Sequence, residues 1–130
     1  MNKRTVRDFK AGVDFWSMVD NWAKETGYAL KESSSTKRLY QKGGVILWPM
    51  MLELSQTGTD VHLEAWVRLY IFRIWPLDVG IESGGFTGFV WNGDFVGSLT
   101  GGVFASLVGR NISRTAVNKL LTRINQPLIQ

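Results

Sequence analysis

The sequence predicts an α+β fold in which an N-terminal helix and a C-terminal amphipathic helix pack on a four-stranded, mostly antiparallel sheet. Three observations predict this class. A one-sided helical pattern occurs near each end, strand-like runs with short polar turns fill the middle, and no repeat or linker divides the 130 residues. We therefore expect one domain over residues 1–130, extended by a glycine-rich β-hairpin.

The first predicted helix runs from residue 14 to about residue 26. Asp14 has the side chain of a helix N-cap, and Gly27 stands where a left-handed residue usually ends a helix. The apolar residues that share one side of this helix are Phe15, Trp16, Met18, Val19, Trp22 and Ala23. The helix must therefore cover a core, whereas residues 1–10, with four bases and one acid, are expected to form a basic arm.

Four segments with the composition of β-strands follow the first helix. They are Tyr28–Glu32, Arg38–Gln41, Val45–Ser55 and Asp60–Phe72. Pro49 lies inside the third segment and has no N–H to donate, so that strand is expected at a sheet edge or with a bulge near Pro49. Pro76 is expected to end regular structure, which leaves residues 77–84 as a connector.

The strand predicted at residues 60–70 alternates in polarity along its length. One face would carry Val61, Leu63, Ala65, Val67 and Leu69. The other face would carry His62, Glu64, Trp66, Arg68 and Tyr70. The aliphatic set is the expected core face, and the second set is expected either to be open to a partner or to lie beneath a second layer.

Residues 84–101, GGFTGFVWNGDFVGSLTG, fit two structures. In the first, a two-residue turn at Asn92-Gly93 forms a β-hairpin that pairs apolar residues with each other, as Val90 with Phe95. In the second, small residues at positions 93, 97, 101, 105 and 109 form a helical ladder. We favour the hairpin, because the helical glycines would cost roughly 4 kcal/mol in water, at about 1 kcal/mol each.

The last predicted helix begins with Ser113 as its cap and reaches about Asn125. Residues 103–108 are expected to form a short helix or an extended piece that ends at Gly109. The apolar side of the last helix carries Ala116, Val117, Leu120, Leu121 and Ile124. We expect this side to dock on the sheet beside the first helix, and the alternative is that it lies on an anionic membrane.

The composition excludes several kinds of site. The chain has no cysteine, which rules out disulfides, thiolate metal sites and cysteine nucleophiles. No apolar h-region of a secretory signal follows the basic N-terminus, and no uncharged run reaches the roughly 20 residues of a spanning helix. We therefore expect a cytoplasmic protein, with attachment to a membrane surface as the alternative.

The polar and aromatic face of the strand at residues 60–70 is the strongest binding candidate, because aromatic and cationic side chains stack on ligands. These candidates are Trp66, Arg68, Tyr70 and Arg73, together with Phe89, Trp91 and Phe95 of the hairpin. His62 and Glu64 would lie about 7 Å apart along the strand and could form an acid–base pair, half of a metal site, or cross-strand hydrogen bonds. We expect hydrogen bonds and neither a metal nor a cofactor, since the chain has one His and no Cys.

No residues have the spacing of a known catalytic motif, although Glu53, Glu64 and Glu82 could converge in space. We therefore expect a non-enzymatic interaction module that binds a protein partner or a second copy of itself through aromatic and apolar surface. One alternative is association with anionic membranes through residues 86–109 and the basic C-terminal helix. Another is nucleic-acid binding by the basic ends, since the net charge is +4.

Overall fold

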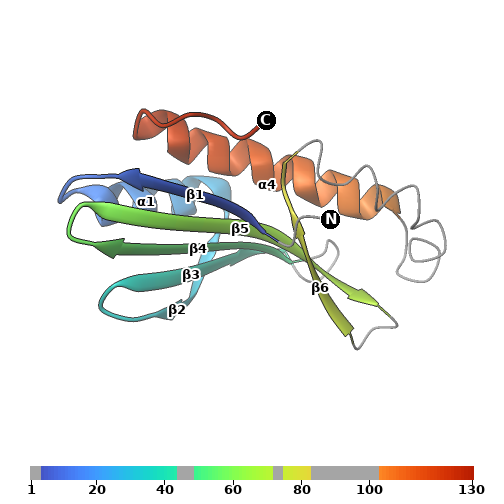
Figure 1. Ribbon diagram of the computed structural model, residues 1–130. Coiled ribbons are helices and arrows are strands. Elements are labelled where there is room, and N and C mark those ends of the chain that lie inside the picture. Colours follow the sequence, from blue (N-terminus) through green and yellow to red (C-terminus); the bar gives the residue numbers. More distant parts are fainter. Residues whose placement is uncertain (1–3, 44–48, 72–74, 83–102) are drawn as a thin grey trace.

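The computed structural model describes residues 4–43, 49–71, 75–82 and 103–130. These residues form an antiparallel sheet and two helices (Figure 1). The strands are β1 (Thr5–Lys10), β2 (Ala29–Ser33), β3 (Lys37–Lys42), β4 (Met50–Thr57), β5 (Asp60–Ile71) and β6 (Trp75–Gly80). The helices are α1 (Phe15–Thr26) and α4 (Val103–Arg123). The predicted α+β class is confirmed, while the described sheet has six strands where four were expected.

The sheet is built around the long strand β5. The strand order is β1-β5-β4-β3-β2, and every described pair is antiparallel. Strand β1 pairs with the first half of β5, and β6 pairs with its second half on the same side, opposite β4. The two short strands therefore share one edge of β5, and they meet where Thr5 Oγ1 accepts a hydrogen bond from the Ile81 N–H at 2.9 Å.

Strand β1 corrects the expectation of a basic N-terminal arm. Thr5 is fully buried and Phe9 packs against the core, so this segment belongs to the folded sheet. Its basic residues are paired with acids: Arg4 with Glu64 and Asp78, Arg7 with Glu82, and Lys10 with Asp60. A segment with a high proportion of bases is therefore a sheet strand here, because its alternate residues face the core and its charges have partners.

Proline positions explain two further differences. Strand β6 includes Pro76, which we expected to end regular structure. No described strand pairs with the other side of β6. The missing N–H of Pro76 therefore leaves most of the hydrogen bonds between β6 and β5 in place. Pro49 lies just before β4, which is an internal strand between β3 and β5 and not an edge. The Pro49 carbonyl still accepts a hydrogen bond from the Arg68 N–H at 2.9 Å.

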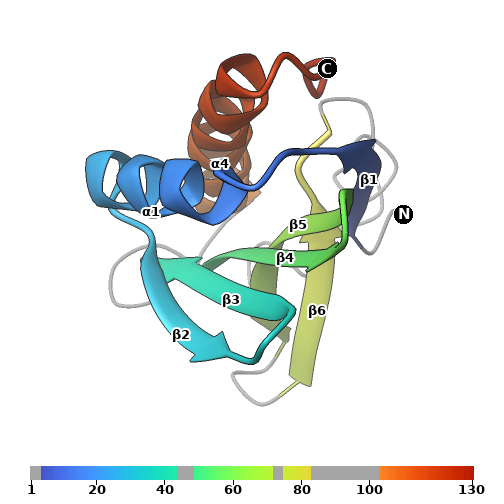
Figure 2. The ribbon, with the colours of Figure 1, turned by 90° about the vertical axis from the view of Figure 1, so that its left-hand side faces the viewer.

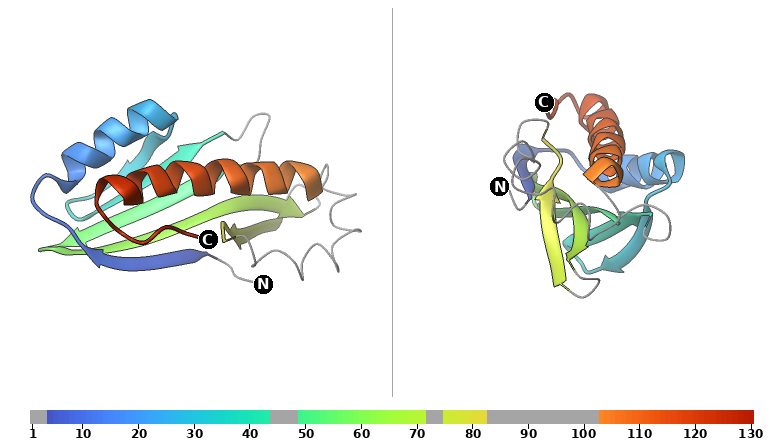
Figure 3. Two further views of the ribbon diagram at one scale, coloured as in Figure 1. Left: turned by 90° about the horizontal axis from the view of Figure 1, so that it is seen from above. Right: turned by 90° about the vertical axis from the view of Figure 1, so that its right-hand side faces the viewer.

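Both helices lie on the same side of the sheet (Figure 2), and the core fills the space between the helices and the sheet. Helix α4 runs lengthwise over the sheet, as Figure 3 shows. The core face predicted for β5 is confirmed at Val61, Leu63, Ala65 and Val67, which are all buried in this core. The side chain of Leu69, the fifth residue of that face, lies outside the described structure. Helix α1 contributes Phe15, Val19, Trp22 and Ala23, and it ends as predicted at Gly27, which has φ 83°. Asp14 stands at the N-cap position without a side-chain capping hydrogen bond.

Helix α4 is one continuous helix, which corrects the prediction that Gly109 and Ser113 mark a boundary. Ser113 is fully buried, and its hydroxyl hydrogen-bonds the Tyr28 hydroxyl at 3.1 Å. The predicted docking face is confirmed by the burial of Ala116, Val117, Leu120 and Leu121. One internal glycine costs about 1 kcal/mol in a helix. Burial of the four apolar side chains exceeds that cost at roughly 1 kcal/mol or more each.

The predicted hairpin about Asn92-Gly93 lies outside the described residues. Both of its alternatives therefore remain predictions. Residues 105 and 109, the last two positions of the small-residue ladder, do lie in α4.

Candidate functional site

The predicted binding row lies on the sheet face opposite the helices. His62, Glu64, Trp66 and Arg68 alternate along β5 with the buried aliphatic residues, so their side chains point away from α1 and α4. Tyr70 lies in β5, but its side chain is outside the described structure. The other predicted binding residues, which are Arg73, Phe89, Trp91 and Phe95, lie outside the described residues.

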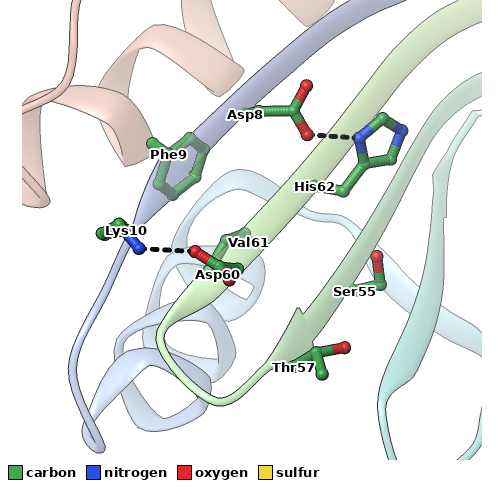
Figure 4. A pocket seen from close by; sticks show the side chains of 8 residues that line it. All are labelled: Asp8, Phe9, Lys10, Ser55, Thr57, Asp60, Val61 and His62. Carbon is green, nitrogen blue, oxygen red and sulfur yellow. Dashed lines mark hydrogen bonds and ion pairs between the residues drawn. The ribbon is translucent and has the colours of Figure 1, made fainter.

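His62 is held between two carboxylates. Its Nδ1 lies 2.6 Å from Asp8 Oδ1 on β1 (Figure 4), and its Nε2 lies 3.1 Å from Glu64 Oε2. The bond to Asp8 raises the pKa of His62 above 6.5, an effect that partial burial opposes and the bond to Glu64 supports. Once protonated, His62 can donate one N–H group to each of these two carboxylates. Among the described residues, no group of three His, Asp or Glu side chains is arranged to hold a metal ion.

The same charges continue along the sheet as an alternating series. Glu64 Oε1 accepts from Arg4 Nη1 at 3.4 Å, and Arg4 Nε donates to Asp78 Oδ2 at 3.1 Å. Asp78 Oδ1 then lies 3.5 Å from Arg68 Nε. We call this series the charge ladder; it comprises Asp8, His62, Glu64, Arg4, Asp78 and Arg68. Because it joins side chains of β5 and β6 to Asp8 of β1 and to Arg4 just before it, the ladder fastens both short strands to the long one.

Trp66 is buried and is not the exposed stacking platform that the sequence allowed. The Arg4 guanidinium lies over its ring, 3.7 Å from the centroid, and its cross-strand neighbour Met51 is buried as well. This face was expected either to be open to a partner or to lie beneath a second layer, and at Trp66 it is covered. Within the described structure, Trp66 Nε1 is a buried donor without a hydrogen-bond partner. This orphan N–H is a local cost, because a buried donor loses its bonds to water.

An open hollow of about 410 Å³ adjoins His62 (Figure 4). Ser55 of β4 is the cross-strand partner of His62, so Asp8, His62 and Ser55 stand in one row across three strands. This order of residue types is that of a nucleophilic triad. The row does not provide an activated serine, because His62 Nε2 is bonded to Glu64 Oε2 and not to the Ser55 hydroxyl.

Two of the three acids that could have converged do so. Glu53 and Glu64 are cross-strand partners on β4 and β5, and each has a cation beside it. Lys37 Nζ lies 3.6 Å from Glu53 Oε1, and Arg4 bonds Glu64. Glu82 is paired instead with Arg7, at 3.4 Å. The carboxylates therefore complete ion pairs on the sheet surface.

The sequence identified His62 and Glu64 because residues two apart on a strand share a face. It did not identify Arg4 or Asp8, since they come from the N-terminal segment, whose register with β5 has no local signal, nor Asp78, since residues 77–84 were expected to be a connector. It also did not identify β2 as a surface. All five residues of β2 are exposed at the outer end of the sheet, and Leu30 keeps 48% of its surface accessible.

None of the described helices is long and apolar enough to cross a membrane. The chain matches no protein-family model, no curated protein and no solved structure with which it was compared.

Proposed function

We propose that the protein is a non-enzymatic interaction module that associates with a second copy of itself through the outer edge of β2. The observation that carries this proposal is the complete exposure of β2 at the end of the strand order. Among the described residues, none pairs with the outer edge of β2, which leaves N–H and C=O groups of Ala29–Ser33 to bond water or another strand. An unpaired edge of this kind is a template for strand addition.

The side chains of β2 suit pairing with an identical strand. Lys31 and Glu32 are adjacent and of opposite charge. Successive residues of a regular strand face opposite sides of the sheet, but the register shift between Leu30 and Glu32 places Leu30 and Ser33 on one face, with the Lys31–Glu32 bulge between them. An antiparallel pair related by a two-fold axis can therefore set this bulge opposite that of the second copy, with Lys31 beside the second copy's Glu32 and Glu32 beside its Lys31. Opposite charges directly across a strand pair contribute roughly 0.2–1 kcal/mol. The same register sets the exposed Leu30 opposite Ser33, so no like charges meet.

The edge is short and irregular, which limits the strength of the association. The register between β2 and β3 shifts between Leu30 and Glu32, in the manner of a β-bulge, and Lys31 has no partner in β3. Bulges and lysines are features that weaken edge-to-edge pairing. We therefore expect a reversible, concentration-dependent dimer, in line with the small interfaces of transient complexes.

Light scattering over a wide range of protein concentration tests this proposal. The mass is expected to rise from one chain to two, and Glu32→Lys is expected to keep the protein monomeric because it sets Lys opposite Lys. Asp60→Lys is the matched control, since it makes the same charge change at an exposed residue at the start of β5, away from β2. A monomer at every concentration would refute the proposal, as would equal dimerisation of Glu32→Lys and the wild type.

A further inference from the structure

A groove between α1 and α4 collects basic side chains from three elements that are distant in sequence. It contains two hollows, of about 380 and 530 Å³, and Glu25 lines both. Lys42 at the end of β3 and Lys119 of α4 line the first, while Lys24 of α1 and Arg123 of α4 line the second. The fold therefore joins the basic residues of the β3 region to those of the last helix.

Most of this positive charge has no acidic partner. Glu25 is the one acid among the lining residues, and Arg123 forms an ion pair with it. Lys24, Lys42 and Lys119 form no ion pair with any residue in the described part of the chain. Four bases against one acid leave the groove with a local charge of about +3.

The end of α1 explains part of this charge. The C-terminus of a helix carries about half a negative charge, which cations in the last turn offset. Lys24 lies in that last turn, and the Lys42 side chain comes within 3.6 Å of the point where a Cβ would stand on Gly27. Half a charge compensates for less than one lysine, however. An excess of more than two positive charges therefore remains in the groove.

The first hollow also provides neutral hydrogen-bonding groups and an apolar floor. Asn111 and Thr115 are exposed on the same side of α4 as Lys119, while Ile112 and Ala116 lie deeper. The Asn111 Oδ1 accepts a hydrogen bond from Arg114 at 2.6 Å, so the Asn111 amide nitrogen is the atom that remains to donate. The hollow thus offers donors of several kinds around a small volume.

We propose that this groove binds a phosphate group, carried by a small phosphorylated molecule or by a lipid headgroup. A phosphate monoester has nearly two negative charges and three acceptor oxygens. These match two lysines, an amide and a hydroxyl, and lysine binds phosphate as a point charge. The volume lies at the lower end of the roughly 300–1,000 Å³ typical of small-molecule sites.

Titration with inorganic phosphate, followed by amide shifts in nuclear magnetic resonance spectra, tests the proposal. Saturable shifts are expected at Asn111, Thr115 and Lys119. Lys42→Gln and Lys119→Gln are each expected to weaken affinity about five-fold, the loss that corresponds to one exposed charge pair. Lys10→Gln is the matched control, since it removes the same charge from β1 and should change the affinity less than two-fold.

A second titration separates the two sources of phosphate. Flotation with vesicles of equimolar phosphatidylcholine and phosphatidic acid, whose headgroup is a phosphate monoester, against pure phosphatidylcholine vesicles, measures headgroup binding. Binding to the anionic vesicles that is lost in Lys119→Gln and retained in Lys10→Gln identifies a headgroup, while saturation by inorganic phosphate without flotation identifies a soluble ligand. Absence of both, or an equal loss in Lys10→Gln, would overturn the proposal, and neither outcome bears on pairing through β2.

Discussion

Two buried tryptophans differ in one hydrogen bond. Trp22 and Trp66 are almost completely buried. Trp22 Nε1 donates to the Ala116 carbonyl at 2.7 Å, whereas Trp66 Nε1 has no partner among the described residues. The indole N–H therefore ties α1 to α4 in the first case and is a cost in the second.

We predict that Trp22→Phe destabilises the protein more than Trp66→Phe does. Both changes replace a buried indole with a smaller phenyl ring. The first also removes a buried hydrogen bond, whereas the second removes a donor that has no partner in the described structure. The difference in the free energy of unfolding should be about 1 kcal/mol, measured by urea denaturation. Equal losses for the two variants would show that Trp66 Nε1 has an acceptor in solution.

His62 makes stability depend on pH in a known direction. Its folded pKa is raised above 6.5, chiefly by the hydrogen bond to Asp8. A raised pKa stabilises the folded state fully below about pH 6.5, and this contribution is lost as the pH rises through the folded value. We therefore predict that the stability difference between the wild type and His62→Gln shrinks as the pH rises from about 6 to about 9. A constant difference in urea midpoints across that range would contradict the arrangement of the charge ladder.

At the scale of the elements, α4 anchors the end of β6 through two arginines. Arg110 is buried, with Nε donating to the Gly80 carbonyl at 2.6 Å and Nη2 donating to the Glu82 carbonyl. Arg114 Nη1 donates to the Ile81 carbonyl at 3.2 Å. Burial, with the nearby Arg114, lowers the pKa of Arg110 to about 10, so it stays charged at neutral pH. Three successive carbonyls are thereby satisfied as the chain leaves the sheet.

We predict that Arg110→Met loosens β6 before the rest of the sheet. The methionine fills similar space but leaves the carbonyls of Gly80 and Glu82 without their donor, at a cost of about 1–3 kcal/mol. Hydrogen exchange should accelerate at the amides of Val79 and Gly80 and remain unchanged in β3 and β4. Thr122→Val is a suitable control because Thr122 is an exposed α4 residue away from β6. Uniform acceleration through all the strands would contradict a local anchor.

Local patterns predicted the elements whose signals are contained within them. Helix α1 follows from its one-sided arc and from Gly27, and the β4–β5 hairpin follows from the turn around Gly58, which has φ 63°. The pairing of β1 with β5 was missed because it joins residues fifty or more apart in the sequence and depends on the assembled sheet. The pairing of β6 with β5 was missed because Pro76 was expected to end regular structure. The continuity of α4 through Gly109 was missed because the packing of the helix on the sheet outweighs the low helix propensity of one glycine.

The sequence also predicted those parts of the candidate site that lie within a single strand. His62 and Glu64 were placed together because both lie on one strand face, and cross-strand hydrogen bonds were the contacts expected there; His62 bonds Asp8 across the strands and Glu64 on its own strand. The burial of Trp66 depends on Arg4, which is far from Trp66 in the sequence. Arg4 comes to lie over the Trp66 ring only because β1 pairs with β5. Periodicity places a side chain on a face, and the neighbouring strands decide whether that face is covered.

At the scale of the whole molecule, the fold puts its two candidate surfaces on different elements. The outer edge of β2 is a strand edge with adjacent opposite charges, and the groove between α1 and α4 is a basic hollow. Association through β2 would join two sheets edge to edge and leave both grooves open. We therefore expect phosphate binding and self-association to be independent, so that Glu32→Lys does not alter the affinity for phosphate.

The charge pairing across β2 is tested most directly by mixing two variants that cannot pair with themselves. Lys31→Glu sets Glu opposite Glu in the proposed register, and Glu32→Lys sets Lys opposite Lys. Both positions are exposed, so each variant should change the free energy of unfolding by about 0.5 kcal/mol or less. In light scattering, we expect each variant alone to remain monomeric and an equimolar mixture to reach the mass of a dimer. A mixture that stays monomeric while the wild type dimerises would contradict pairing of Lys31 with Glu32 across a shared β2 edge.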